Sequence, residues 1–169
     1  GGGAAMSEPA VLAGAGGELS VTLRAAPGSR LGGRSTMALG YNGSSPGPTL
    51  VVHRGDLLRV RLENDLDEPT NLHTHGLHVS PEGISDNVFR AVEPGTAADY
   101  EYRIPEDHPA GTFWYHPHHH GTVADQVFGG LHGALLVVGD DEPPVDRERV
   151  IVISDTTLTP GGAVAGVSH

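Results

Sequence analysis

Two pairs of histidines, each with one intervening residue, have the type and spacing needed for metal chemistry. One pair is His73 and His75, and the other is His116 and His118. On an extended strand, residues i and i+2 point to the same face, so each pair offers two imidazoles to one side. Imidazole is the commonest metal ligand in proteins and suits copper, zinc, iron and nickel. Four such imidazoles predict a metal site.

The remaining histidines have a simpler interpretation. An isolated histidine is usually a surface residue or a hydrogen-bonded one, and we expect this of His53, His108 and His169. His78 and His132 stay open between a packing role and a role in supporting the ligands. For the two pairs, burial without a metal would leave several ring nitrogens unpaired, at a cost of about 1–3 kcal/mol each. The metal interpretation is therefore the stronger one for the pairs.

Cysteine is absent from all 169 residues. This excludes disulfides, thiolate zinc sites and a blue-copper centre within the chain, since the last of these requires a cysteine sulfur. The formal net charge of -11 argues against nucleic acid and anionic membranes as partners. No apolar run approaches the roughly 20 residues of a membrane-spanning helix, so we expect no such span. Small cations, including metal ions, are compatible with this charge.

The elements that carry the histidines are predicted to be short strands. The 25 glycines and 13 prolines favour a β-rich chain with many turns, and a chain of 169 residues can form one domain with a hydrophobic core. A long loop over residues 80–94 and a helical turn over 121–128 are also predicted. This pattern predicts an all-β Greek-key sandwich or barrel. The predicted strands cover residues 19–24, 36–41, 50–53, 57–63, 70–75, 98–104, 112–116, 131–138 and 150–154.

The predicted domain covers residues 16–158. Residues 1–15 begin with Gly-Gly-Gly-Ala-Ala-Met and are expected to be a tag, a linker or a disordered N-terminus, without the basic and apolar segments of a signal peptide. Residues 159–169 are small and glycine-rich, and we expect a flexible C-terminal connector there. Because a strand is predicted shortly before this connector, the chain is expected to stop where a larger protein continues.

The text around the two histidine pairs resembles a known family. Asn71-Leu-His-Thr-His-Gly-Leu77 and Gly111-Thr-Phe-Trp-Tyr-His-Pro-His-His-His-Gly121 resemble the first two copper-binding motifs of multicopper oxidases, the laccase-like family. The second motif is particularly similar to the bacterial copper-efflux type. The resemblance spans residues 41–141 and continues more weakly to residue 154. Both motifs in this order and separation are specific, whereas a lone His-x-His would not be.

The resemblance implies a cupredoxin fold and a trinuclear copper cluster shared between the first and last domains of the protein. His73 would bind the type 2 copper, and His75, His116 and His118 would bind the two type 3 coppers. Asp86 stands where the family often places a carboxylate near the cluster, and there it would relay protons or orient a histidine. A turn-forming aspartate beside an asparagine is an equally good interpretation of Asp86.

Four further residues of the second motif surround these ligands. His120 matches a histidine that is not a copper ligand in the copper-efflux type, and His119 occupies a variable position, so the roles of both stay open. Trp114 and Tyr115 are expected to be core aromatics, or aromatics of the site wall, that hold the histidines in place.

The resemblance also implies a reaction, in which dioxygen is reduced to water with electrons from a reducing substrate. A complete member of the family carries further cupredoxin domains and a His-Cys-His segment that links a blue copper to the cluster, and no such segment follows Gly121. We therefore expect this chain to be the N-terminal domain, with half of the cluster ligands, inactive until a C-terminal domain or another subunit completes the site. The family implies a periplasmic or secreted location.

Three alternatives remain open at this point. The chain could be a non-catalytic copper-binding cupredoxin module that needs no partner domain. It could hold a hydrolytic zinc site, because three histidines and a water make a catalytic zinc centre. It could also self-associate, because a domain separated from its neighbours exposes the apolar face that would pack against them.

Overall fold

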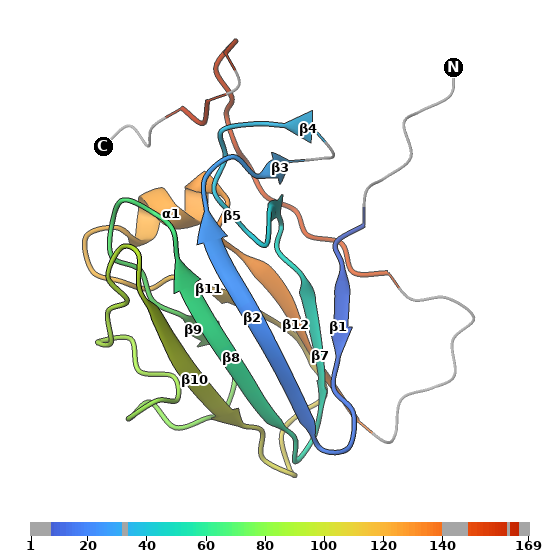
Figure 1. Cartoon of the computed structure of the whole chain (residues 1–169). Helices are drawn as coiled ribbons and strands as arrows, with labels where there is room; N and C mark the ends of the chain where they lie inside the picture. The colour runs from blue at the N-terminus through green and yellow to red at the C-terminus, as the bar shows by residue number, and fades with distance from the viewer. Residues whose placement is uncertain (1–7, 32–33, 140–148, 162, 166–169) are drawn as a thin grey trace, which may run out of the picture.

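The computed structural model describes residues 8–31, 34–139, 149–161 and 163–165 (Figure 1). Within these residues the chain forms two β-sheets, and a single α-helix, α1 (Val123–Gly129), lies near one end of them. The all-β sandwich predicted from the sequence is confirmed.

The first sheet carries both histidine pairs at or beside its edge. β11 runs antiparallel to both of its neighbours, whereas β1, β7 and β12 are mutually parallel. The strands follow one another across the sheet in the order β1 (Val11–Ala13), β7 (Thr49–His53), β12 (Gly133–Val138), β11 (Gly111–His116) and β9 (His73–His75).

The second sheet is built around two long strands, β2 and β8, which pair in parallel over eight positions. β10 pairs antiparallel with β8 and closes this side of the sandwich. The strand order is β10 (Ala97–Arg103), β8 (Leu57–Asn64), β2 (Glu18–Ala26), β5 (Gly40–Tyr41), β6 (Ser44–Ser45), β3 (Arg30–Leu31) and β4 (Arg34–Ser35).

The hydrophobic core lies between the two sheets. Strand β8 shows how the sequence builds it, because Leu58 and Val60 are buried whereas the intervening Arg59 is exposed. This alternation is what a strand with one face on the core requires. Leu135 of the first sheet belongs to the same buried cluster as these residues. The core therefore fixes both sheets, and with them the strands that carry the histidines.

Most predicted strands lie within two residues of observed ones. The helical turn predicted over residues 121–128 is confirmed as α1, and the long loop over 80–94 contains no strand. The strand predicted over residues 70–75 is shorter than expected, with only its last three residues in β9. Thr70 instead forms an isolated antiparallel bridge with Val92, at the end of the long loop.

The strand predicted over residues 36–41 is largely wrong, since only Gly40–Tyr41 are paired. The hydroxyl of Thr36 donates to the carbonyl of Ser29 at 2.8 Å and accepts from the amide of Ala38 at 3.0 Å. Such local bonds between a hydroxyl and the main chain compete with strand pairing. They divert the chain until Gly40.

The strand predicted over residues 150–154 is also wrong, because these residues pair with no described strand. Ile151 and Ile153 are 69% and 93% exposed. A run of β-branched apolar residues alone does not make a strand, since the backbone groups of a strand need a neighbouring strand to pair with. The apolar pattern is present here without a neighbouring edge among the described residues.

The N-terminal boundary predicted at residue 16 leaves out one strand. Val11–Ala13 form β1, which pairs in parallel with Thr49–Val51 of β7, so the expectation of a linker or disorder is wrong for these three residues. At the other end, residues 162 and 166–169 of the predicted connector lie outside the described residues. Leu158 and Val164 form an isolated bridge within the part that is described.

Candidate metal centre

Strands β9 and β11 bring the two histidine pairs together. They are antiparallel neighbours, with His73 opposite His116 and His75 opposite Trp114. His118 follows the end of β11, beyond Pro117. Strand pairing thus makes direct neighbours of residues more than 40 positions apart in the sequence, such as His73 and His116. The Cβ atoms of such cross-strand neighbours lie about 4.5–5.5 Å apart.

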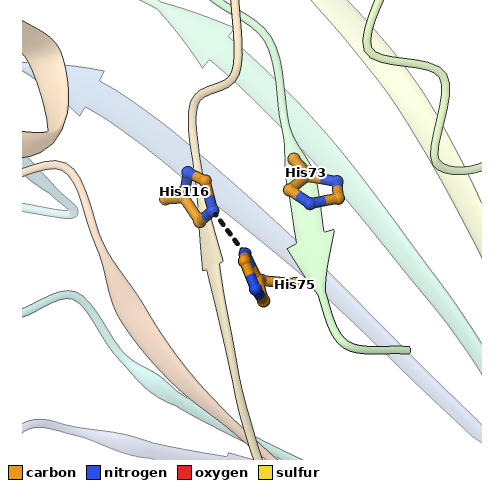
Figure 2. A group of neighbouring side chains, drawn as sticks. All are labelled: His73, His75 and His116. Carbon is orange, nitrogen blue, oxygen red and sulfur yellow. Dashed lines mark hydrogen bonds between the residues drawn. The ribbon is translucent and has the colours of Figure 1, made fainter. Parts of the chain in front are cut away.

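Three of the four predicted ligands converge on one point. His73, His75 and His116 each offer a ring nitrogen, and these nitrogens all lie within 4.8 Å of one another. Figure 2 shows the three rings facing a common space between the two strands, with Nδ1 of His75 3.5 Å from Nε2 of His116. Three neighbouring imidazole nitrogens could hold one metal ion.

The fourth predicted ligand, His118, lies next to this group. The centroid of its ring is 5.3 Å from that of His73 and 6.2 Å from that of His116. All four predicted histidines are therefore gathered at one edge of the first sheet, three as a tight group and His118 beside it.

Asp86 lies within hydrogen-bond distance of His73. Nδ1 of His73 lies 2.9 Å from one carboxylate oxygen of Asp86, and the other oxygen accepts from the amide of Thr74 at 2.9 Å. A carboxylate only accepts hydrogen bonds, so Nδ1 of His73 carries the proton and Nε2 keeps its lone pair for a metal. The sequence left Asp86 open between a turn former and a partner of a histidine. Its hydrogen bond to the predicted ligand His73 supports the second interpretation.

The carbonyl of Pro117 does the same for His116. Nδ1 of His116 lies 2.7 Å from this carbonyl oxygen and must donate to it, which leaves Nε2 as the free nitrogen. The pKa of His116 is lowered to about 4, chiefly by burial and to a smaller extent by the neighbouring histidines, while the bond to Pro117 acts in the opposite direction. The ring is therefore neutral at pH 7, as metal binding requires.

Trp114 and Tyr115 divide the two roles expected of them. Trp114 is 38% exposed and stacks on His116 with ring centroids 4.0 Å apart, so it forms a wall of the site. Tyr115 is fully buried and donates to the carbonyl of Pro48 at 2.7 Å, as a core residue. A groove of about 630 Å³ is lined by Trp114, by residues of α1 and by residues 150–156, and none of the four histidines lines it.

Asn71 is a site residue that the sequence did not single out. Its side chain is fully buried, its oxygen accepts from the amide of His118 at 2.6 Å, and its nitrogen donates to the carbonyl of Val88 at 2.7 Å. Its position two residues before His73 was visible in the first motif. The sequence did not show that its hydrogen-bond partners, Val88 and His118, come from two distant segments.

None of the other histidines in the described part of the chain belongs to the group of three converging rings. His108 is buried, and both of its nitrogens bond to main-chain groups, Nδ1 to the carbonyl of Pro109 and Nε2 to the amide of His78. His132 is a buried residue whose Nε2 has no hydrogen-bond partner, and burial lowers its pKa. His120 is exposed, with its ring centroid 6.5 Å from that of His118.

The donor set fits copper. All the converging atoms are imidazole nitrogens, a ligand type that copper shares with zinc, iron and nickel, and two of the rings are held in a defined tautomer by Asp86 and Pro117. A two-sheet β-sandwich with such a cluster at a sheet edge defines a metal-binding domain of the cupredoxin-like class.

The comparisons with known proteins identify the family. A family model described as multicopper oxidase matches residues 22–142. The chain is 37% identical over 125 residues to multicopper oxidase mco of Staphylococcus aureus, and 32% identical over 158 residues to copper resistance protein A of Pseudomonas syringae pv. tomato. The chain belongs to the multicopper oxidase family.

The solved structures agree on the fold. A laccase from Pediococcus acidilactici superposes with a TM-score of 0.70 at 31% identity, over 83% of this chain and 31% of the laccase. The predicted cupredoxin-like fold is confirmed. The alignments cover 73% and 91% of this chain but only 27% of the Staphylococcus protein and 25% of the Pseudomonas protein. The chain thus spans about a quarter of the length of these relatives.

The lack of a long apolar run in the sequence predicted no membrane span. Among the described residues, no helix has both the length and the apolar character to cross a lipid bilayer.

Proposed function

We propose that this chain is the N-terminal cupredoxin domain of a multicopper oxidase and supplies half of the histidine ligands of a trinuclear copper cluster. His73 would hold the type 2 copper, and His75, His116 and His118 would hold the type 3 coppers. The observation that carries the proposal is the convergence of three imidazole nitrogens within 4.8 Å, with His118 beside them. Membership of the multicopper oxidase family supports copper as the metal.

Residues of this chain hold the ligand rings in the tautomer that metal binding requires. Asp86 and the carbonyl of Pro117 hold the protons of His73 and His116 on Nδ1, so that Nε2 of each ring is the nitrogen that binds. Trp114 covers one face of His116 and limits the rotation of its ring. Copper bound here would supply the redox chemistry by which dioxygen is reduced to water. Asp86, which is within hydrogen-bond distance of His73, is the group we propose to hold or pass a proton beside the cluster.

We propose that the remaining ligands and the electron entry site come from residues outside this chain. No cysteine occurs in the 169 residues, so a blue-copper centre has no sulfur ligand here. The relatives are about four times as long as the segment they share with this chain, which supports a further domain, or another subunit, as the source. We also propose a periplasmic or secreted location, in line with the family.

Copper titration combined with an oxidase assay tests this function. We expect the 169-residue chain to bind copper and to show no turnover of phenols or cuprous ion, because half of the cluster is missing. The His116→Ala variant is the matched control for binding, since it removes one of the three converging nitrogens. Turnover by the chain alone would contradict the half-site proposal.

A second candidate function is a non-catalytic copper-binding module. It is favoured by the same three nitrogens, which already form a group that could hold one ion without any partner. Size-exclusion chromatography with metal analysis separates the two functions. A copper affinity of the monomer that a complementary domain leaves unchanged supports the module, whereas an affinity that rises when a complementary domain is added supports the shared cluster.

A further inference from the structure

The cluster is assembled from three segments that are distant in sequence. β9 brings His73 and His75, the long loop brings Asp86, and β11 with the turn after it brings His116 and His118. The first two segments are joined by the Thr70–Val92 bridge and by the bonds of Asp86 to Thr74. The His118 segment leaves β11 at Pro117, where regular strand pairing has ended, so something else must fix its distance from β9.

Asn71 contacts all three segments. It lies on the approach to β9, two residues before His73, and its amide nitrogen donates to Val88, two residues after Asp86. Its amide oxygen accepts from the main-chain amide of His118 at 2.6 Å. The side chain is fully buried, so water cannot replace either partner. A single amide group thereby links the loop, the strand and the turn.

We propose that Asn71 is a positioning residue of the copper site, which holds His118 at its distance from His73 through the amide oxygen. The proposal rests on the proposed function, since it assigns Asn71 to the same cluster. Asn71 touches no metal ligand atom. It acts on the backbone of His118, and therefore on where that imidazole can reach.

A buried asparagine can also serve stability alone, and Asn64 provides the matched control for that. Asn64 is fully buried as well, donates to the carbonyls of Glu68 and Val92, and accepts from the amide of Leu66. None of these partners belongs to the His118 segment. Loss of either asparagine side chain therefore costs buried hydrogen bonds, but only Asn71 is bonded to a segment that carries a predicted ligand.

The test is a double-mutant cycle on copper binding by the 169-residue chain, with Cu(II) as the probe. We expect Asn71→Ala to weaken copper binding about tenfold or more, the range known for residues that support metal ligands. Asn64→Ala should lower the melting temperature and leave copper affinity unchanged. The Asn71→Ala/His118→Ala double variant should bind no more weakly than His118→Ala. Additive losses in the double variant, or equal losses from Asn64→Ala, would overturn the proposal.

A conservative variant and a copper-free measurement complete the test. Asn71→Asp keeps an acceptor for the His118 amide and loses the donor to Val88, so its copper affinity should stay closer to that of the unsubstituted chain than Asn71→Ala does. Equal losses from both variants would contradict the role of the oxygen. In the metal-free protein, hydrogen exchange at the His118 amide should accelerate in Asn71→Ala and not in Asn64→Ala. This readout decides on Asn71 even if the unsubstituted chain binds no copper, which would overturn the proposed function instead.

Discussion

Two groups of histidines lie in this sandwich, and they use their ring nitrogens in opposite ways. In the cluster on β9 and β11, His73 and His116 each donate a hydrogen bond from one ring nitrogen to an oxygen. The other nitrogen of each ring faces the space that the rings share. In the second group, the rings of His78 and His108 lie 4.9 Å apart, as close as those in the cluster. Both ring nitrogens of His108, however, form hydrogen bonds with main-chain groups.

The difference teaches that proximity and burial of histidines do not make a metal site. His108 is as buried as any ligand of the cluster, yet it has no lone pair left, and it serves as a clasp between the chain after β9 and the turn before β11. The cluster is distinguished by the rings of His73 and His116, each of which has one oxygen acceptor that fixes its tautomer and leaves the lone pair on the opposite nitrogen. The partners of the imidazoles, more than their number, mark the site.

The largest difference in copper affinity should appear between a variant that lacks one ring of the cluster and a variant that lacks one ring of the second group. His116→Ala deletes one of three converging nitrogens, so copper binding should fall by at least about 100-fold, beyond the range for residues that only support ligands. His108→Ala should leave copper affinity within about twofold and lower the free energy of unfolding by about 1–3 kcal/mol, the cost of buried groups left unpaired. Calorimetric copper titration and chemical denaturation of both variants measure the two quantities. A loss of copper binding in His108→Ala would erase the distinction between the groups.

A smaller effect is expected from the acceptor of His73. Asp86→Asn removes the charge that holds the proton on Nδ1, and copper affinity should fall about 10–100-fold. Asp99→Asn is the control, because Asp99 is an exposed carboxylate that pairs with Arg61 at 3.2 Å, away from the site. Competition titration with a chelator of known copper affinity compares the two variants. Equal affinities of Asp86→Asn and the unsubstituted chain would mean that the tautomer of His73 needs no carboxylate.

The smallest effect concerns stability against pH in the metal-free chain. Burial holds the pKa of His116 at about 4, below the ordinary 6.5, so between these values the unfolded chain binds a proton that the folded protein does not. This group therefore makes the protein less stable as the pH falls from about 6.5 towards 4, and contributes no further change below that. His116→Gln should flatten the stability profile in this window, and His120→Gln, at an exposed ring, should not. Denaturation at a series of pH values provides the comparison, and parallel profiles for His116→Gln and the unsubstituted chain would contradict it.

The strands could be predicted from the sequence better than the hydrogen-bond partners of the site residues. β8 and β10 follow from alternation alone, because each has one face on a shared core. The four predicted ligands follow from two spaced pairs, because strand geometry puts i and i+2 on one face. The segment over 150–154 has a continuous run of β-branched apolar residues, and it forms no strand because pairing depends on a neighbour that the pattern does not encode.

Long-range hydrogen bonds are what the sequence could not give. Asp86 was suggested by resemblance, yet its bond to His73 crosses 13 positions and depends on how the long loop folds back. The bond of Asn71 to His118 crosses 47 positions, and no local pattern marks either end of it. The same holds for the clasp formed by His108, whose partner lies 30 positions earlier in the chain. Local periodicity fixes faces and spacing, whereas these contacts depend on the complete fold.

The most direct test of the account is anomalous scattering at the copper edge from crystals of this chain grown with copper. We expect a peak in the space between the rings of His73, His75 and His116, where the three nitrogens converge (Figure 2). A peak at His78 and His108, or no peak between β9 and β11 in a copper-saturated crystal, would contradict the central claim.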